Sequence, residues 1–178
     1  YFLFMAMAVK MLRTNGEFVF ITPRSWTSGT YFKSFRSYFM DSMDIQRVHL
    51  FESRNSVFKG KEGHSDDILQ ETMITYGKKS KSQSRNIIIA ISQNAQDLGK
   101  VKEIQVESGN CLPEGKEHYF VLPSDEEDLK VLNYMKKMPN TVEEAGFRFK
   151  TGQVVEFRNK EYIAWEKKES TIPLLHSC

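Results

Sequence analysis

The chain has 178 residues, with 25 Lys and Arg against 23 Asp and Glu, which gives a formal net charge of +2. This near-neutral balance does not identify a partner by itself. A hydrophobic content of 40% and an aromatic content of 12% exclude a disordered tail, a collagen-like repeat and a coiled coil. We therefore expect one sizeable hydrophobic core or two small ones.

The cysteines and the first residues bear on where the protein works. Cys111 and Cys178 are too few for a disulfide scaffold and are typical of a reducing cytosol. The apolar run at the start ends at Lys10, short of the roughly 20 residues that a membrane span needs, and no basic segment precedes it as in a signal peptide. We therefore expect a cytoplasmic protein without a membrane segment. Because the chain begins with Tyr1 and enters a helix without a cap residue, we also expect a piece of a longer polypeptide.

Helix-like and strand-like segments alternate in the first part of the chain. Apolar residues on nearly every side predict a buried helix over 1–13, and a continuous apolar run over 17–22 predicts a strand buried on both faces of a parallel sheet. The spacing of aromatic residues predicts a second helix over 31–42. Strands are predicted over 45–51 and 72–76. This alternation with short connections predicts an α/β sheet covered by helices on both faces.

The second half of the chain predicts further strands and one capped helix. A polar stretch over 78–85 predicts a solvated loop, followed by a strong strand over 86–92 and a weaker one over 101–106. Ser124 and Glu127 have the spacing of a capping box, which predicts Ser124 as the N-cap of a helix that continues to Met135. Two short strands joined by a glycine turn are predicted over 146–158.

Charge divides the chain unevenly. Residues 1–85 hold 13 basic and 8 acidic side chains, whereas residues 86–178 hold 12 basic and 15 acidic ones. The first half is therefore the better candidate for an anionic partner. Residues 146–168 are locally basic again and contain five aromatic side chains, a combination that suits nucleic acid.

No glycine-rich phosphate loop, no Cys or His cluster at metal-ligand spacing and no nucleophile turn is found in the sequence. One candidate site is the segment from Thr22 to Trp26, directly after the predicted buried strand, because open α/β sheets bind ligands at the carboxyl ends of their strands. In the structural alternative, Pro23 merely ends the strand and Trp26 caps the core.

The second candidate site is the polar segment 55–61. It contains Phe58 beside Lys59 and Lys61, and an aromatic ring flanked by cations suits stacking on a base next to a phosphate. In the structural alternative, Phe58 packs under its own loop.

The order of these segments resembles the adenine-N6 DNA methyltransferases of type II restriction-modification systems. The resemblance rests on the first helix, the strand ending in Thr22-Pro23, the aromatic helix, and the strand pair on either side of Val57-Phe58. It implies the C-terminal half of a class I (Rossmann-like) methyltransferase sheet, followed by a small α+β extension. The implied domains are a partial catalytic domain over 1–79, a β-rich extension with one capped helix over 80–140, and the start of a target recognition domain over 141–178.

The resemblance also implies a reaction. The family transfers a methyl group from S-adenosylmethionine to N6 of an adenine flipped out of double-stranded DNA. The family's S-adenosylmethionine loop and its Asn-Pro-Pro-Tyr motif do not occur in the sequence. We therefore expect the cofactor to be bound mainly by residues upstream of this chain, and we expect the isolated chain to be inactive.

Site residues follow from the same resemblance. Phe58 matches the aromatic residue that stacks on the flipped adenine. The remaining predicted DNA contacts are one tryptophan and six cations, namely Trp26, Arg24, Lys59, Lys61, Arg148, Lys150 and Arg158.

Three functions stay in competition. The first is a fragment of the adenine methyltransferase, acting on double-stranded DNA with a restriction endonuclease domain or subunit as a partner. The second is a non-catalytic DNA-binding or specificity module that binds duplex through residues 148–168. The third, half of a small-molecule methyltransferase, leaves the basic loop and the long tail without a role.

Overall fold

The computed structural model describes two compact units, residues 1–137 and residues 138–178, and each is treated by itself. The described residues are 1–53, 71–97, 99, 101–148, 158, 160–164, 166, 169 and 172.

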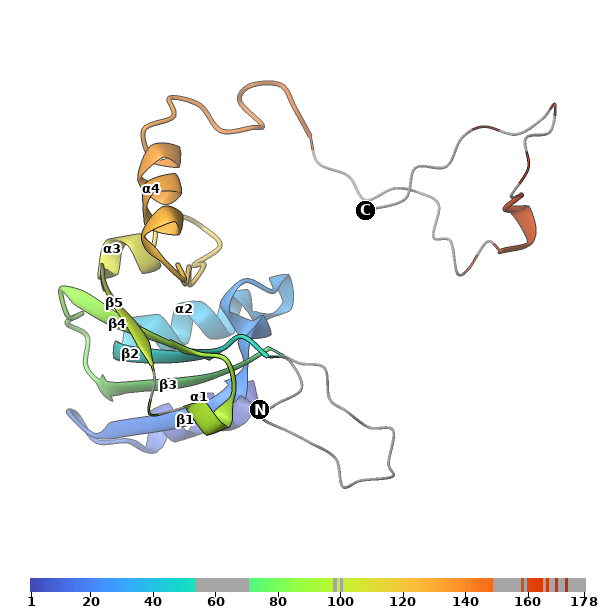
Figure 1. Ribbon diagram of the computed structural model, residues 1–178. Helices are drawn as coiled ribbons and strands as arrows, with labels where there is room; N and C mark the ends of the chain where they lie inside the picture. Colours follow the sequence, from blue (N-terminus) through green and yellow to red (C-terminus); the bar gives the residue numbers. More distant parts are fainter. Residues whose placement is uncertain are drawn as a thin grey trace, which may run out of the picture. The chain divides into compact units, whose positions relative to one another are not determined.

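Five strands of the first unit lie side by side in one mixed sheet (Figure 1). The strands are β1 (Glu17–Pro23), β2 (Met43–Phe51), β3 (Thr72–Lys79), β4 (Asn86–Ser92) and β5 (Lys102–Glu107), in the spatial order β1-β3-β2-β4-β5. β3 is antiparallel to both β1 and β2, and β4 is parallel to β2. Consequently β1, β2 and β4 run in the same direction. Their carboxyl ends lie together at one end of the sheet, which we call the carboxyl edge. The predicted α/β architecture is confirmed, and the segment 80–140 contributes two strands to the same sheet as the segment 1–79.

Helices connect and flank these strands. The α-helices are α1 (Phe2–Met11), α2 (Lys33–Ser42), α3 (Ser108–Cys111) and α4 (Glu126–Met135), and the 3-10 helices are η1 (Arg24–Thr27), η2 (Thr30–Phe32), η3 (Ala95–Asp97) and η5 (Lys160–Tyr162). The ammonium group of Lys79 donates to the carbonyl oxygens of Val9 and Leu12 at 2.7 and 2.6 Å, which satisfies the carboxyl end of α1. Within the described part of the chain, no helix has the length and apolar character needed to cross a membrane.

One face of the sheet carries the core. Alternate residues of each strand point to this face and pack against the inward sides of α1 and α2, which contribute Met5, Val9, Phe35 and Phe39. Gly77 lets β2 and β3 approach, since a Cβ atom there would lie 2.2 Å from the carbonyl oxygen of Asp44. In Figure 1, α2 lies behind the strands.

The opposite face of the sheet is more open, and this corrects two expectations. Val19 and Ile21 on β1 are 64% and 50% exposed, so the strand is not buried on both faces as its apolar run predicted. The reason is that Val19 and Ile21 alternate with Phe18 and Phe20, which face α1 and α2 in the core, and so point to the opposite face. The described helices α1 and α2 both join the core on one face, so the predicted cover on both faces is not found among the described residues.

Three boundaries differ from the sequence predictions. The N-cap of α4 is Asp125, whose side chain accepts a hydrogen bond from the Asp128 amide at 2.9 Å, whereas Ser124 donates its own amide to Asp128. β3 continues to Lys79, into the segment predicted as a loop, because Lys78 and Lys79 still pair with β2. Of the two strands predicted over 146–158, residues 146–148 are not in a strand and 149–157 lie outside the described residues.

Candidate functional site

The shared carboxyl edge of β1, β2 and β4 brings together distant parts of the chain. Arg24 follows β1 directly and its amide donates to the carbonyl oxygen of Glu71, which precedes β3, at 2.8 Å. The residues after β2 and β4 stay paired at this edge, with the amide of Glu52 donating to the carbonyl oxygen of Ser92 at 3.0 Å. This is the edge at which open α/β sheets bind ligands.

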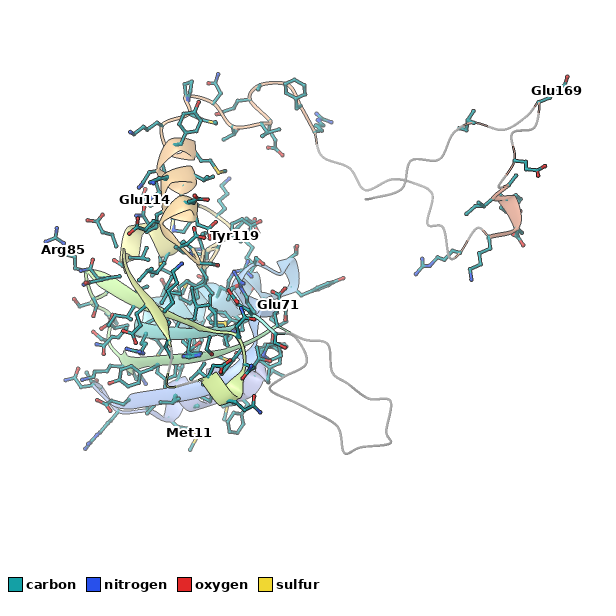
Figure 2. The ribbon with its side chains drawn as sticks, viewed as in Figure 1. Met11, Glu71, Arg85, Glu114, Tyr119 and Glu169 are labelled. Carbon is teal, nitrogen blue, oxygen red and sulfur yellow. The ribbon has the colours of Figure 1, made fainter. Side chains whose placement is uncertain are left out.

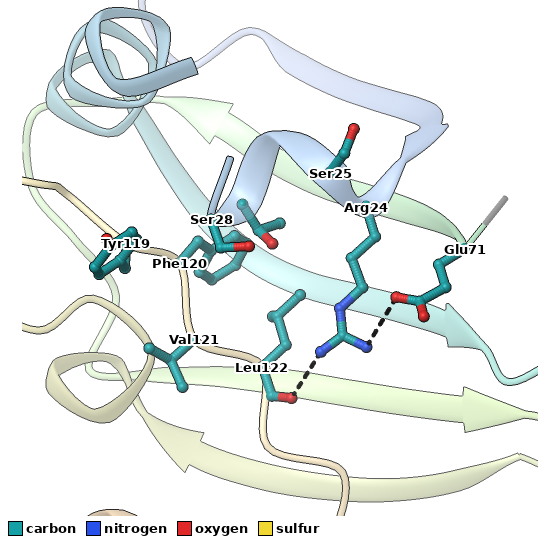
Figure 3. A pocket seen from close by; sticks show the side chains of 9 residues that line it. Arg24, Ser25, Ser28, Glu71, Tyr119, Phe120, Val121 and Leu122 are labelled. Atoms are coloured by element: carbon teal, nitrogen blue, oxygen red, sulfur yellow. Dashed lines mark hydrogen bonds and ion pairs between the residues drawn. The ribbon is translucent and has the colours of Figure 1, made fainter. Parts of the chain in front are cut away.

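A pocket of about 590 Å³ opens at this edge. One wall is η1 with Ser28, and the other is the extended segment 119–122, which returns from α3 (Figure 3). The amide of Phe120 donates to the carbonyl oxygen of Thr27 at 2.9 Å and so holds the two walls together. The sequence predicted the first wall at this place and contained no signal for the second.

Arg24 lies at the rim of the pocket, as Figure 3 shows. Its guanidinium makes two long contacts, 3.5 Å to the carbonyl oxygen of Leu122 and 3.9 Å to the carboxylate of Glu71. Both side chains of this ion pair are more than one third exposed, so solvent screens their attraction. The predicted DNA contact Arg24 is therefore accessible and only weakly held.

Trp26 is a core residue. Its ring is fully buried, its indole N–H donates to Thr22 Oγ1 at 3.1 Å, and it packs edge-on against Phe35 and Phe39. A side chain without exposed surface cannot contact DNA directly. The DNA contact predicted for Trp26 is therefore wrong in this structure, and the structural alternative describes the residue correctly.

Arg36, which the sequence did not single out, connects the two walls of the pocket. The residue is fully buried. Its guanidinium donates to the carbonyl oxygens of Trp26 and Gly29 on one side, at 2.9 and 2.6 Å, and to those of Glu117 and His118 on the other, at 2.8 and 3.0 Å. Burial lowers the pKa of Arg36, because the charged form loses hydration, and neighbouring Tyr119 and Glu117 act against this change.

The same contacts fix Tyr119, a second residue that sequence reasoning missed. His118 adopts the left-handed conformation with φ of 50°, and Arg36 binds the carbonyl oxygen of this residue. The Tyr119 ring lies 5.4 Å from the Arg36 guanidinium carbon and is 44% exposed. No local pattern could have revealed this arrangement, because the contacts join residues more than 80 positions apart.

A histidine and a serine meet on neighbouring parallel strands near the same edge. His49 Nε2 lies 2.8 Å from Ser92 Oγ, and Ser92 Oγ is 3.2 Å from the carbonyl oxygen of Asn94. Burial and the charge of Arg47 lower the pKa of His49, whereas Glu103 raises it. The pair does not line the pocket at the carboxyl edge, and we assign it a structural role.

The other predicted contacts are distributed as follows. Phe58, Lys59, Lys61 and Lys150 lie outside the described residues. Arg148 and Arg158 are exposed side chains of the second unit, 138–178. The described residues therefore bring only Arg24 of the predicted contacts to the pocket.

The sequence of the chain is similar to those of known proteins. Residues 1–58 match the family described as Eco57I restriction-modification methylase. The chain is 30% identical over 176 residues to the type II methyltransferase M.PstI of Providencia stuartii, which covers 98% of this chain and 34% of that protein. It is 31% identical over 180 residues to the type II methyltransferase M.BsuBI of Bacillus subtilis, covering 99% of this chain and 34% of that protein. The chain thus spans about a third of the length of these curated relatives.

Two solved structures show weak similarity to the chain. The type IIG restriction endonuclease BpuSI has a TM-score of 0.44 and 12% identity, over 60% of this chain and 14% of that one. The M protein of the type I restriction enzyme EcoKI has a TM-score of 0.47 and 7% identity, over 80% of this chain and 45% of that one.

The sequence relatives extend along nearly the whole chain, and the family match covers the first helix, β1, α2 and β2 but not β3, which also belonged to the resemblance. The chain is therefore similar in sequence to restriction-modification methyltransferases, the resemblance that its own sequence predicted.

Proposed function

We propose that the chain works as part of a longer DNA methyltransferase, which transfers a methyl group from S-adenosylmethionine to N6 of adenine in a restriction-modification system. The similarity of almost the entire chain to type II methyltransferases carries this proposal. We place the protein in the cytoplasm with double-stranded DNA as its substrate and a restriction endonuclease domain or subunit as its partner.

The described lining of the pocket at the carboxyl edge does not select for the methyl donor. S-adenosylmethionine carries a sulfonium and an ammonium group, which the guanidinium of Arg24 at the rim would repel, and a carboxylate, which it would attract, so this cation does not select for the donor. Backbone glycines, which let a phosphate or a ribose approach a main chain closely, do not line the pocket. We therefore assign the methyl donor, which supplies the methyl group when it is bound, to residues upstream of Tyr1.

The chain's own contribution is to hold the DNA around an extruded adenine. The amine of adenine takes part in base pairing, so the base must leave the stack at a cost of a few kcal/mol. Stacking on an aromatic ring stabilises the extruded base by roughly 1–3 kcal/mol. We propose Phe58 for this stacking, and Arg24, Lys59 and Lys61 for contacts with phosphates, which make binding sensitive to salt.

The second unit supplies further contacts in this proposal. Its exposed cations Arg148 and Arg158, together with Lys150, begin the domain that recognises the target sequence. The competing function is a DNA-binding or specificity module without catalysis, which the same cations would serve. The two differ in chemistry, because only the first requires methyl transfer by the longer polypeptide.

A methyl-transfer assay tests the proposal. The longer polypeptide and the 178-residue chain are each incubated with DNA and labelled S-adenosylmethionine, and the modified base is identified by mass spectrometry. We expect N6-methyladenine from the longer polypeptide and no transfer by the chain alone. Methylated cytosine, or transfer by the isolated chain, would show that the proposal is wrong, and DNA binding without any methylation favours the specificity module.

A substitution at Phe58 tests the stacking role. Phe58→Ala in the longer polypeptide removes the ring, and we expect kcat/KM for methylation to fall by about 5-fold to 160-fold, corresponding to roughly 1–3 kcal/mol of stacking. Phe58→Trp keeps an aromatic surface and should retain most activity. Phe4→Ala, at an exposed phenylalanine of α1, is the matched control. Equal activity of Phe58→Ala and the unsubstituted enzyme would exclude Phe58 from the site.

A further inference from the structure

We propose that the pocket between η1 and the segment 119–122 takes one nucleotide of the DNA, with its phosphate at Arg24 and its base stacked on the ring of Tyr119. This inference rests on the proposed function for the identity of the polymer. It adds a binding site and a residue, Tyr119, to those expected from the sequence.

Tyr119 presents an exposed aromatic ring that is held rigidly in place. Tyr119 is 44% exposed although it lies beside the fully buried Arg36. Arg36 binds the carbonyl oxygens of the two residues that precede Tyr119, at 2.8 and 3.0 Å. The ring is thus held in place before any ligand binds, so little conformational entropy is lost when a base stacks on it. Tyr119 and Glu71, both labelled in Figure 2, line the pocket.

The residue before Tyr119 has an unusual backbone conformation. His118 has φ of 50°, a region that residues other than glycine rarely adopt. Such conformations persist where surrounding contacts enforce them, and they cluster at ligand-binding positions. Here the hydrogen bonds of His118, from Arg36 to its carbonyl oxygen and from its amide to Gly115, hold the segment in this conformation.

The guanidinium of Arg24, at the rim of the pocket, is bound only weakly by its neighbours. Arg24 makes contacts of 3.5 and 3.9 Å with its two described partners, both longer than a good hydrogen bond. A phosphate can accept two N–H bonds from a guanidinium in a bidentate arrangement, and so can compete with the screened carboxylate of Glu71. The hydroxyl group of Ser28, which also lines the pocket, can donate to phosphate or sugar oxygens.

The volume fits these groups. A pocket of about 590 Å³ lies within the size range of pockets that hold small ligands. A cation, hydroxyl groups and an exposed ring are the parts with which proteins bind nucleotides of unstacked DNA without reading their sequence. The apolar floor is formed by Phe120, which packs 5.8 Å from the ring of Trp26.

Fluorescence anisotropy with a short labelled oligodeoxythymidylate and the full 178-residue chain tests this site. We expect Tyr119→Ala to weaken binding by about 5-fold or more, because stacking on the ring is lost. Tyr119→Phe keeps the ring and should bind within about 2-fold of the unsubstituted chain. Tyr134→Ala, at a tyrosine of α4 that is 68% exposed and outside the pocket, is the matched control and should leave binding unchanged.

The Arg24 end of the pocket is tested by salt dependence. Arg24→Gln should reduce the slope of log K against log salt concentration by about 0.7, the value for one contact with single-stranded DNA. Glu71→Gln removes the competing carboxylate and should strengthen binding. Photocrosslinking with an iododeoxyuridine-containing oligonucleotide should label Tyr119, mapped by mass spectrometry.

Several results would overturn the inference. They are absence of oligonucleotide binding by the chain, unchanged binding by Tyr119→Ala, and crosslinks confined to residues 138–178. The methyl-transfer assay decides the proposed function separately. If the longer polypeptide methylates adenine while Tyr119→Ala binds normally, only the pocket assignment is wrong.

Discussion

Arg36 shows how one buried side chain can hold two distant segments of the chain together. All of its recorded hydrogen bonds go to main-chain carbonyl oxygens, two from the turn after β1 and two from the segment before Tyr119. Buried carbonyl oxygens without donors cost about 1–3 kcal/mol each. The guanidinium therefore supplies donors to carbonyl oxygens of both segments, and among the described residues only that of Gly29 is known to accept a second hydrogen bond, from the Phe32 amide at 3.1 Å.

The first prediction concerns this residue. Arg36→Met keeps the length of the side chain and removes the donors, and we expect the free energy of unfolding to fall by about 3 kcal/mol or more. Chemical denaturation followed by circular dichroism measures the change. Lys33→Met is the matched control on α2, since Lys33 forms a partly exposed ion pair with Glu117 at 2.6 Å and its loss should cost less than about 1 kcal/mol. Equal effects of the two substitutions would contradict the role given to Arg36.

The second prediction is a pH dependence from His49. Burial lowers the pKa of His49 in the folded state, so the unfolded chain binds the proton more tightly. The stabilisation from the neutral ring is fully present above the unfolded pKa, about 6.5, and is lost as pH falls through the lower folded pKa. We expect the free energy of unfolding to fall more steeply below pH of about 6.5 in the unsubstituted chain than in His49→Gln. Parallel curves from denaturation at several pH values would contradict this prediction.

At the scale of residues, the sequence indicated part of the pocket. Arg24 was predicted because it directly follows an apolar strand, and the structure places it at the carboxyl edge. Trp26 follows the same strand, but its place in the core depends on Phe35, Phe39 and Phe120, which come from other elements. Tyr119 could not be predicted, since its position depends on Arg36 and not on its neighbours in sequence.

At the scale of elements, the contact between β2 and β3 depends on one glycine. A Cβ atom at Gly77 would lie 2.2 Å from the Asp44 carbonyl oxygen and 2.8 Å from the Phe18 ring, too close for any side chain. Ile45 is the pairing partner of Gly77, and the register of β2 shifts directly after it, between Ile45 and Arg47. Close approach of the two strands and the packing of Phe18 are therefore coupled at this position.

The third prediction follows from this contact. Gly77→Ala should lower the free energy of unfolding by about 2 kcal/mol or more, because β2 or Phe18 must move. Gly109→Ala is the control, since nothing lies within 4 Å of the added Cβ atom in α3 and alanine favours a helix over glycine by about 0.5–1 kcal/mol. Thermal or chemical denaturation distinguishes them. A Gly77→Ala variant as stable as the unsubstituted chain would contradict the close contact.

The presence of each helix and strand was predicted more reliably than the residues at which it begins and ends. Periodicity indicated α1, α2 and the five strands, since the helical and strand repeats of apolar residues are local properties. The extension of β3 to Lys79 was missed because Lys78 and Lys79 are polar and owe their strand conformation to pairing with β2. The N-cap of α4 was shifted by one residue, because Ser124, Asp125 and Asp128 offer two overlapping capping patterns.

At the scale of the whole molecule, the first unit has an open apolar edge. Val19 and Ile21 are at least half exposed on β1, and the α1 residues Phe4, Met7 and Met11 are 71%, 56% and 80% exposed. Edge strands of natural proteins are usually protected by charges or covered. Within the described residues neither protection is present along the middle of β1, which favours association with another apolar surface.

The fourth prediction concerns this edge. Val19→Lys places a charge on the open face of β1, and we expect self-association of the chain to decrease. Sedimentation velocity at several protein concentrations measures it. Val131→Lys on α4 is the control, because Val131 is 57% exposed but lies away from the sheet edge. If both substitutions reduce self-association equally, the added net charge is the cause. If Val19→Lys does not reduce self-association, β1 does not mediate it.

The sequence by itself determined the class of fold, the order of helices and strands, the similarity to restriction-modification methyltransferases and the position of Arg24 after β1, because these depend on local apolar periodicity and on linear patterns. Tertiary structure decided which faces are covered, that Trp26 belongs to the core, and that the segment 119–122 forms the second wall of the pocket. The reason is physical: burial and preorganisation arise from contacts between residues such as Arg36 and His118, which are 82 positions apart in the chain and adjacent in space.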